Sequence, residues 1–309
     1  MNKIERIDAV LNGEKPDRIP ASFWFHFPSE KKAGEAMAEA HIEYYQACDP
    51  DFLKVMNDNR YDMPSDMPII DKPEDWAKLP KNPVSATNYQ KQISGIKILT
   101  EKLKGEAYLT TTVFDPMAVG NYISNKRVID HLRANPEATM KGLAAIAESL
   151  ADFAVACIEA GAAGIYYSAQ AGGVEKMSRE EHLKYMKPLE LMIWDAAASK
   201  GKLNILHLCG PGMYFHNYQH YPFDVVNWAL GLPGNLTITE GKEFFKKPIC
   251  GGLDNNGVII TGPKEAIEEE VQAAIEEGGE TNFILGANCT VPNSIDWKNL
   301  RTAINYVCK

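Results

Sequence analysis

The sequence predicts an α/β fold, a parallel (β/α)8 barrel in which helices surround a ring of strands. Short apolar segments alternate with helical segments along the chain, and eight of these segments have the properties of strands. Neither a second composition regime nor a flexible linker interrupts this pattern. A doubly wound open sheet gives the same local pattern, but the strand count favours the barrel. We therefore expect residues 1–309 to form a single barrel domain with an N-terminal helical addition.

The predicted strands are short and apolar, and the one at 51–56 ends in the polar residues 57–59, where a strand should pass into a loop. The strands span 21–27, 51–56, 107–113, 163–168, 204–210, 223–228, 248–252 and 282–286. The predicted helices lie between them and carry apolar residues at helical spacing. They span 2–12, 30–47, 88–104, 126–134, 136–160, 178–199, a short aromatic stretch to 220, 263–277 and 294–307. A proline-rich segment, 60–87, is expected to be a long connection over one end of the core.

Local signals mark the ends of several helices. Gly13 and Pro16 are expected to end the first one, and Gly201 to close the helix that precedes the fifth strand. Ser178 and Glu181 have the spacing of a capping box, in which each side chain accepts a hydrogen bond from the backbone of the other. A helix should therefore begin directly after Ser178.

The composition is that of an ordinary globular protein. Hydrophobic residues make up 45% of the chain and charged residues 24%, which is enough apolar content for a sizeable core. No run approaches the roughly 18 apolar residues of a membrane span, and the N-terminus lacks the apolar segment of a secretory signal, so we expect a cytoplasmic protein. The formal charge of −9 argues against nucleic-acid binding. The six cysteines include no CxxC pair, and we expect reduced thiols.

The predicted fifth strand ends in two residues that commonly bind metal ions. His207 and Cys209 are two positions apart, so their side chains point to the same side of an extended chain. Imidazole and thiolate together are typical zinc ligands. The alternative is a core strand with a hydrogen-bonded histidine and a cysteine that packs as a small hydrophobic residue.

A third ligand is expected from the last strand. Cys289 follows the predicted eighth strand, and the carboxyl ends of barrel strands converge at one mouth. Three protein ligands with an open fourth position are typical of catalytic zinc sites, whereas structural sites are closed by four. The long separation from Cys209 also differs from a zinc finger and favours a site assembled by the fold.

The sequence around these ligands resembles a known protein family. The segments that carry the resemblance are Leu11–Pro20, His207–Gly210, Val226–Trp228, Gly251–Asp254 and Cys289–Pro292. They are similar to the uroporphyrinogen decarboxylase superfamily, and within it to methylcobalamin:coenzyme M methyltransferases and related corrinoid-dependent methyltransferases. The resemblance covers essentially the whole chain and implies a (β/α)8 barrel.

For the methyltransferase branch, the resemblance implies a zinc ion held through an H-x-C…C motif, which falls on His207, Cys209 and Cys289. It also implies a corrinoid such as methylcobalamin as co-substrate, carried by a partner corrinoid protein. The chain departs from the decarboxylases, which carry an arginine-bearing loop after the first strand and a histidine after the last. Here those places hold Phe25–Lys32, without arginine, and Ala287–Cys289. Decarboxylation of uroporphyrinogen is therefore not expected.

The sequence thus predicts a zinc-dependent methyltransferase that moves a methyl group between a corrinoid and a thiol or another small molecule. Zinc would keep the substrate sulfur deprotonated, and the thiolate is the nucleophilic form. One alternative is a metal-free decarboxylase or lyase acting on a carboxylated substrate, for which Arg60 is the main candidate cation. Another is a non-catalytic corrinoid-binding protein that uses the same mouth.

Further polar residues near the ends of predicted strands are candidates for substrate binding. They are His26, Asn57, Asp58, Tyr166, Gln170, Asn227 and Asp254. Each has a structural alternative. The aromatic neighbours of His26 suit a packed histidine, and the polar residues that close strands often cap the following loop or helix.

Three other residues belong to metal-ligand types but are assigned structural roles. Cys250 lies inside the predicted seventh strand, and we expect it to pack in the core instead of serving as a spare ligand. His216 and His220 have helical i,i+4 spacing, but the glutamate of an HExxH motif is missing between them. We expect them to lie at the surface or to pack.

Overall fold

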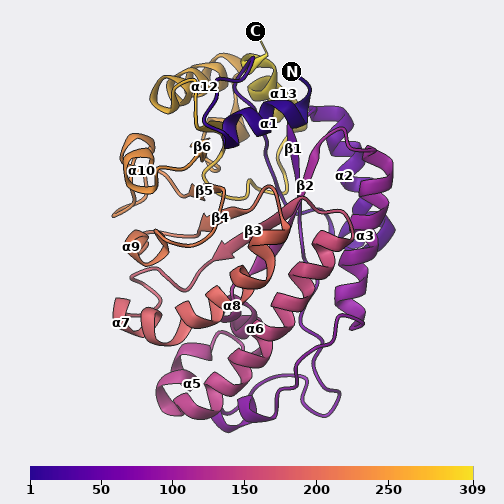
Figure 1. Cartoon of the computed structure of the whole chain (residues 1–309), viewed down its shortest axis with the longest axis vertical. Coiled ribbons are helices and arrows are strands. Elements are labelled where there is room, and N and C mark those ends of the chain that lie inside the picture. The colour runs from indigo at the N-terminus through magenta and orange to yellow at the C-terminus, as the bar shows by residue number, and fades with distance from the viewer. Residues whose placement is uncertain (309) are drawn as a thin grey trace.

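The computed structural model describes residues 1–308 and shows an α/β fold built on a parallel, curled sheet (Figure 1). Among these residues, seven strands lie side by side in chain order, each paired in parallel with the next. They are β1 (Phe52–Val55), β2 (Tyr108–Phe114), β3 (Gly164–Ala169), β4 (Ile205–Leu208), β5 (Val225–Trp228), β6 (Ile249–Leu253) and β7 (Phe283–Ala287). The predicted α/β class is confirmed, and the sheet is TIM-barrel-like.

The helices lie around this sheet and connect its strands (Figure 1). They are α1 (Lys3–Leu11), α2 (Gly34–Cys48), α3 (Thr87–Leu103), α4 (Pro116–Ile123), α5 (Val128–Ala134), α6 (Pro136–Glu159), α7 (Arg179–Glu181), α8 (Lys187–Ala197), α9 (Phe215–Tyr218), α10 (Ile238–Phe245), α11 (Val258–Thr261), α12 (Lys264–Gly278) and α13 (Trp297–Val307). Short helices of other types are η1 (Ser29–Lys31), η2 (Pro73–Lys78), η3 (His182–Met186) and η4 (Ala198–Lys200). Within residues 1–308, no helix has the length and apolar character needed to cross a membrane.

Capping residues begin one helix that the sequence predicts and two helices that it does not. The predicted capping box is present, because Ser178 Oγ accepts from the Glu181 amide at 3.1 Å and Glu181 Oε2 accepts from the Ser178 amide at 2.8 Å. Neither α4 nor α10 is among the helices predicted from the sequence. Both have a signal in the sequence, since Asp115 caps α4 in front of a proline and Thr237 begins a further capping box with Glu240.

The prediction of a regular strand at residues 21–27 is wrong. This segment forms isolated parallel bridges, Ala21 with Leu285 and Phe25 with Val291. Side chains take up the carbonyls that a continuous ladder would use: Tyr44 donates to the Phe23 oxygen at 2.8 Å, and Ser22 donates to the Phe52 oxygen at 2.7 Å. The segment therefore lies along β7 without completing a ladder.

Side chains that share one face of the sheet form an enclosed core of their own. It contains Ile7, Val10, Trp24, Phe52, Met56, Tyr166, Leu203, Ile205, Val225, Cys250 and Ile284. These residues come from α1, the 21–27 segment, six of the strands and positions next to β1 and β4, whereas the larger core lies among the helices. Because strand residues alternate between faces, this apolar layer sits directly beneath the inward-facing polar side chains at the carboxyl ends of the strands.

A buried ion cluster joins the N-terminal segment to the start of β1. The Asp51 carboxylate is completely buried and lies 2.7 Å from both Arg6 and Arg18. It also accepts a hydrogen bond from the Ala21 amide at 2.8 Å. Charged groups remain stable in such surroundings only when they are paired and hydrogen-bonded, so Asp51 fixes α1 and the 21–27 segment against the sheet.

Candidate metal site and cavity

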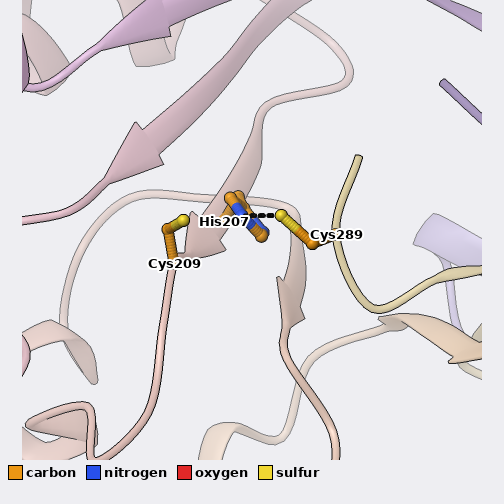
Figure 2. Close-up of side chains that lie close together, drawn as sticks. All are labelled: His207, Cys209 and Cys289. Atoms are coloured by element: carbon orange, nitrogen blue, oxygen red, sulfur yellow. Dashed lines mark hydrogen bonds between the residues drawn. The ribbon is translucent and has the colours of Figure 1, made fainter. Parts of the chain in front are cut away.

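The predicted metal-ligand residues come together at the carboxyl ends of β4 and β7. His207 lies within β4, Cys209 follows its last residue, and Cys289 follows β7 (Figure 2). Their ligand atoms all lie within 4.8 Å of one another. The Cys209 amide donates to the Ala169 oxygen of β3 at 2.9 Å, which continues the parallel pairing beyond β4. The fold thus brings residues that are distant in sequence to one place.

The spacing of the donor atoms suits a tetrahedral zinc ion. The Cys289 sulfur lies 3.5 Å from His207 Nε2 (Figure 2). A nitrogen at about 2.1 Å and a sulfur at about 2.3 Å from a tetrahedral zinc ion are roughly 3.6 Å apart. One imidazole and two thiols also form a borderline-soft donor set of the kind that zinc prefers. The residues present therefore fit the metal that the sequence predicts.

Asn227 on β5 determines which nitrogen of His207 is free to bind a metal. The Asn227 amide nitrogen donates to the carbonyls of Cys250 at 2.7 Å and Ala287 at 3.1 Å, which fixes the orientation of the amide. Its oxygen lies 2.5 Å from His207 Nδ1. Because this oxygen can only accept, Nδ1 carries the hydrogen, and the lone pair of the neutral ring is on Nε2, which points at the cysteines.

Tyr166 on β3 holds the same histidine from a second direction. Its ring stacks on His207 with centroids 5.5 Å apart, and its hydroxyl donates to Asn227 Oδ1 at 3.0 Å. Tyr166 is 1% exposed. Two neighbouring side chains thus fix the plane and the tautomer of the ring in advance, as outer residues do around metal-bound histidines.

The two site cysteines differ in their readiness to ionise. Interaction with the Cys209 thiol, aided by His207, holds the pKa of Cys289 well below its usual range. The same interaction, together with burial, raises the pKa of Cys209. Two neighbouring thiolates repel each other in a buried site, so the second ionisation needs a positive charge close by. A divalent cation between the sulfurs would supply that charge.

A cavity of about 330 Å³ opens over these ligand atoms. It is lined by all three metal-ligand residues and by other residues predicted from strand ends, namely His26, Asn57, Asp58, Arg60, Tyr166 and Gln170. A space of this size suits a small molecule.

Two other predicted residues lie outside the cavity lining. Asn227 is completely buried behind His207. Asp254 is exposed, and its carboxylate accepts from the Asn256 amide at 2.9 Å in the loop before α11, so it does not cap that helix.

Cys250, His216 and His220, which the sequence assigns to packing or surface roles, lie in the core or at the surface. Cys250 packs in the enclosed core beneath the site. His216 lies at the surface with its ring against Phe244, at a centroid distance of 4.9 Å, and His220 is exposed. These positions agree with the packing and surface roles expected from the sequence.

Lys54 lines the cavity but is not among the site residues predicted from the sequence. It is only 4% exposed and lines the cavity, with its nitrogen 3.0 Å from the Met56 sulfur and 4.1 Å from the centre of the Tyr166 ring. Among the described residues, no carboxylate lies within ion-pair distance of it. The signal was a lysine in the middle of a buried strand, where charged residues are rare unless paired. Burial lowers the pKa of Lys54 to about 7, against the opposing effect of nearby acidic groups.

Substitution of Lys54 by methionine is expected to stabilise the metal-free protein at low pH. In the unfolded chain the Lys54 amine keeps its proton up to its ordinary pKa, whereas in the folded chain it loses the proton above about pH 7. The free-energy cost of burying the charged amine is therefore largest below pH 7 and decreases as the pH rises. Lys54→Met should raise the free energy of unfolding at pH 6 by about 1–4 kcal/mol, with a smaller gain at pH 9. Urea unfolding at both values measures this, with exposed Lys200→Met as control. If Lys54→Met were less stable than the unchanged protein at pH 6, the Lys54 ammonium would have a favourable partner in the folded chain.

Comparison with known proteins places this fold and site in a family. Residues 55–309 match the family model described as uroporphyrinogen decarboxylase (URO-D). The chain belongs to the uroporphyrinogen decarboxylase family. The family expected from the sequence is therefore confirmed, and the matched part of this URO-D family member includes His207, Cys209 and Cys289.

Solved structures extend the likeness to the whole fold of this URO-D family member. A methyltransferase from Methanosarcina mazei is 17% identical, with a TM-score of 0.78 over 100% of this chain and 98% of the other. A B12-independent methionine synthase from Shewanella sp. W3-18-1 is 14% identical, with a TM-score of 0.50 over 70% of this chain and 64% of the other. Identities this low show a shared fold. No curated protein matches the chain significantly.

Proposed function

We propose that this URO-D family member is a zinc-dependent methyltransferase that moves a methyl group between a corrinoid and a thiol or another small acceptor. The observation that carries the proposal is the arrangement of His207, Cys209 and Cys289, with the lone pair of His207 directed at two thiols by Asn227. Three protein ligands facing a cavity leave a fourth position for the substrate. A zinc ion bound there would act as a Lewis acid that keeps a substrate thiol in its thiolate form.

The residues around the ligands are suited to a nucleophilic thiolate. Two cysteine thiolates and a neutral histidine balance the charge of a divalent cation, so a fourth, anionic sulfur keeps much of its electron density. The amide oxygen of Asn227 accepts from His207 Nδ1 and leaves the lone pair of Nε2 available to a metal ion. In the transfer the thiolate sulfur forms a bond to the methyl carbon, and the electron pair of the carbon–cobalt bond stays on cobalt.

The size of the cavity favours a corrinoid presented from outside. A space of about 330 Å³ accommodates a small thiol, whereas a corrin macrocycle with its side chains is several times larger than such a molecule. The methyl group would therefore enter from the cavity mouth while the macrocycle remains above it. This supports a separate corrinoid protein as the partner.

The enclosed core supports a more complete description of the fold. We propose that residues 1–309 form one (β/α)8 domain, in which the 21–27 segment takes the place of an eighth strand and α1 is an N-terminal addition beneath the core. Trp24 reaches this core beside Phe52, and Ile7 of α1 packs against it. We further propose that the protein acts in the cytoplasm.

A demethylation assay tests the proposed function. Purified protein should contain about one zinc ion per chain and should convert methylcobalamin to its demethylated form when a thiol such as 2-mercaptoethanol or 3-mercaptopropionate is added. Absorbance follows the corrinoid, and mass spectrometry detects the methyl thioether. Protein without zinc that fails to demethylate would overturn the proposal, and binding without demethylation would favour a non-catalytic corrinoid-binding role.

One observation favours the metal-free lyase as a second candidate. Lys54 and Arg60 both line the cavity, and cations there would hold a carboxylated substrate. Release of carbon dioxide from a carboxylate in the absence of zinc would support this reading, while dependence of methyl transfer on zinc would exclude it as the main activity.

A further inference from the structure

A second histidine lines the same cavity and has a different partner from the first. The side chain of His26 is 34% exposed, and its Nδ1 lies 2.7 Å from Asp58 Oδ1. The ring nitrogen and the carboxylate oxygen are in close contact, although the N–H direction departs from regular hydrogen-bond geometry. A carboxylate at Nδ1 places the hydrogen on that nitrogen and leaves Nε2 as the site that gains or loses a proton.

The two cavity histidines have partners of different charge, Asn227 for His207 and Asp58 for His26. His207 faces the amide of Asn227, whose oxygen accepts from Nδ1 and leaves Nε2 free for a metal ion. His26 faces a carboxylate, which stabilises the positive charge that the ring acquires when Nε2 takes up a proton. Histidines that act as proton carriers in enzymes are commonly oriented by a carboxylate in this way. The first arrangement suits a metal ligand and the second suits a general base.

The carboxylate of Asp58 is held in its charged form by its surroundings. Burial favours the neutral acid, but contacts with His26 and with Lys32 keep the pKa of Asp58 below its usual range. The Lys32 nitrogen lies 3.6 Å from the same oxygen. Asp58 therefore remains an anion near neutral pH and can balance a protonated His26.

Other charged groups near this pair lie on several elements. Lys54 of β1 interacts electrostatically with Asp58 and with both site cysteines, and Arg60 lines the cavity. His41 of α2 is also near Asp58, but burial lowers its pKa to about 4 and its ring nitrogens are occupied by backbone partners. Lys54 is almost fully buried, whereas His26 is one-third exposed and can exchange a proton with solvent.

We propose that His26, oriented by Asp58, accepts the proton of the substrate thiol as the thiol binds in the cavity. The inference rests on the proposed function and assigns a general base to it. The S–H bond breaks, the electron pair remains on sulfur, and the proton moves to His26 Nε2, with Asp58 balancing the new charge. His26 holds the proton while the thiolate is bound and returns it to solvent through its exposed edge only after the methyl thioether has left. The thiol reaches the metal-ligand residues as a thiolate without a prior, unfavourable ionisation in water.

Proton counting during thiol binding tests this role without the methyl-transfer reaction. Titration calorimetry of zinc-containing protein with 2-mercaptoethanol, at pH 7.5 in buffers of different ionisation enthalpy, gives the number of protons released to buffer. For the unchanged protein we expect nearly none, because His26 retains the proton. His26→Gln should release about one proton per bound thiol, and Asp58→Asn should do the same because an imidazolium beside an amide is less stable. Exposed His220→Gln is the control and should match the unchanged protein.

The pH profile of demethylation gives a second measurement. Without a base, the rate depends on the fraction of thiolate already in solution, so His26→Gln should be about 100-fold slower at pH 7 and recover about tenfold per pH unit towards the pKa of the thiol. A purely structural role would lower the rate equally at every pH. An unchanged protein that neither binds thiols nor demethylates methylcobalamin would overturn the proposed function. If the unchanged protein is active, two results for His26→Gln would overturn only the role of His26. One is proton release equal to that of the unchanged protein, and the other is a decrease in demethylation rate that is the same at every pH.

Discussion

Replacement of Cys289 by serine is expected to remove zinc from the purified protein and to lower methyl transfer by more than about 100-fold, since even the loss of a residue that only supports a ligand costs about 10–100-fold in metal affinity or activity. Cys289 approaches His207 Nε2 at 3.5 Å and is the proposed ligand from the loop after β7. A serine hydroxyl is a poor zinc ligand at neutral pH, and two remaining ligands do not complete a catalytic site. Metal analysis and the methylcobalamin assay measure the two effects separately.

Matched cysteine variants make this result specific. Cys209→Ser should behave like Cys289→Ser, because both sulfurs belong to the same group of ligand atoms. Cys308→Ser carries the same substitution at an exposed position and should keep full zinc content and activity. Retention of one zinc ion per chain by both Cys209→Ser and Cys289→Ser would refute the three-residue metal site.

Replacement of Asp51 by asparagine is expected to destabilise the fold by about 3–5 kcal/mol, the usual cost of removing one partner from a buried ion pair. Asparagine keeps the shape of the side chain but leaves Arg18 without its anionic partner and weakens the hold on Arg6, whose other carboxylate contact is Asp17. The substitution also removes the carboxylate that accepts from the Ala21 amide. Denaturant unfolding monitored by circular dichroism measures the loss.

A neighbouring carboxylate provides the control for this prediction. Asp49 pairs with Lys3, but its side chain is 51% exposed. Exposed ion pairs contribute about 0–1 kcal/mol, so Asp49→Asn should have little effect. Equal effects of the Asp49 and Asp51 substitutions would show that burial of the Asp51 cluster adds nothing to stability.

Most of the fold could be predicted because its signals are local. Apolar segments of strand length and amphipathic helices repeat along the chain, and seven of the eight predicted strands are present among residues 1–308. The 21–27 segment has the composition of a strand, yet its pairing depends on Tyr44 and Ser22, whose side chains take carbonyls that a ladder would use. Such competition between side chains and backbone depends on tertiary contacts and is invisible in a hydrophobic pattern.

The part of the candidate site that depends on local sequence could be predicted, and the part that depends on tertiary contacts could not. His207 and Cys209 share one strand, so their common direction follows from the alternation of strand residues. The sequence shows neither the pairing of Asn227 with His207 nor that of Asp58 with His26, because each joins side chains from different elements. Lys54 could have been recognised as a charge inside an apolar strand, but its position above Tyr166 follows only from the packing of β1 and β3.

The bonds of Asn227 also determine the order in which this protein could acquire its metal. Its side chain on β5 reaches a carbonyl of β6 and another of β7 while it contacts the histidine of β4. His207 and Cys289 are 82 positions apart, so an unfolded chain has no preformed site to capture an ion. Zinc-finger domains fold around their metal, whereas a zinc ion at this site would bind after these four strands have come together. Metal loading would then be a late and separable step, which an already folded apoprotein could undergo.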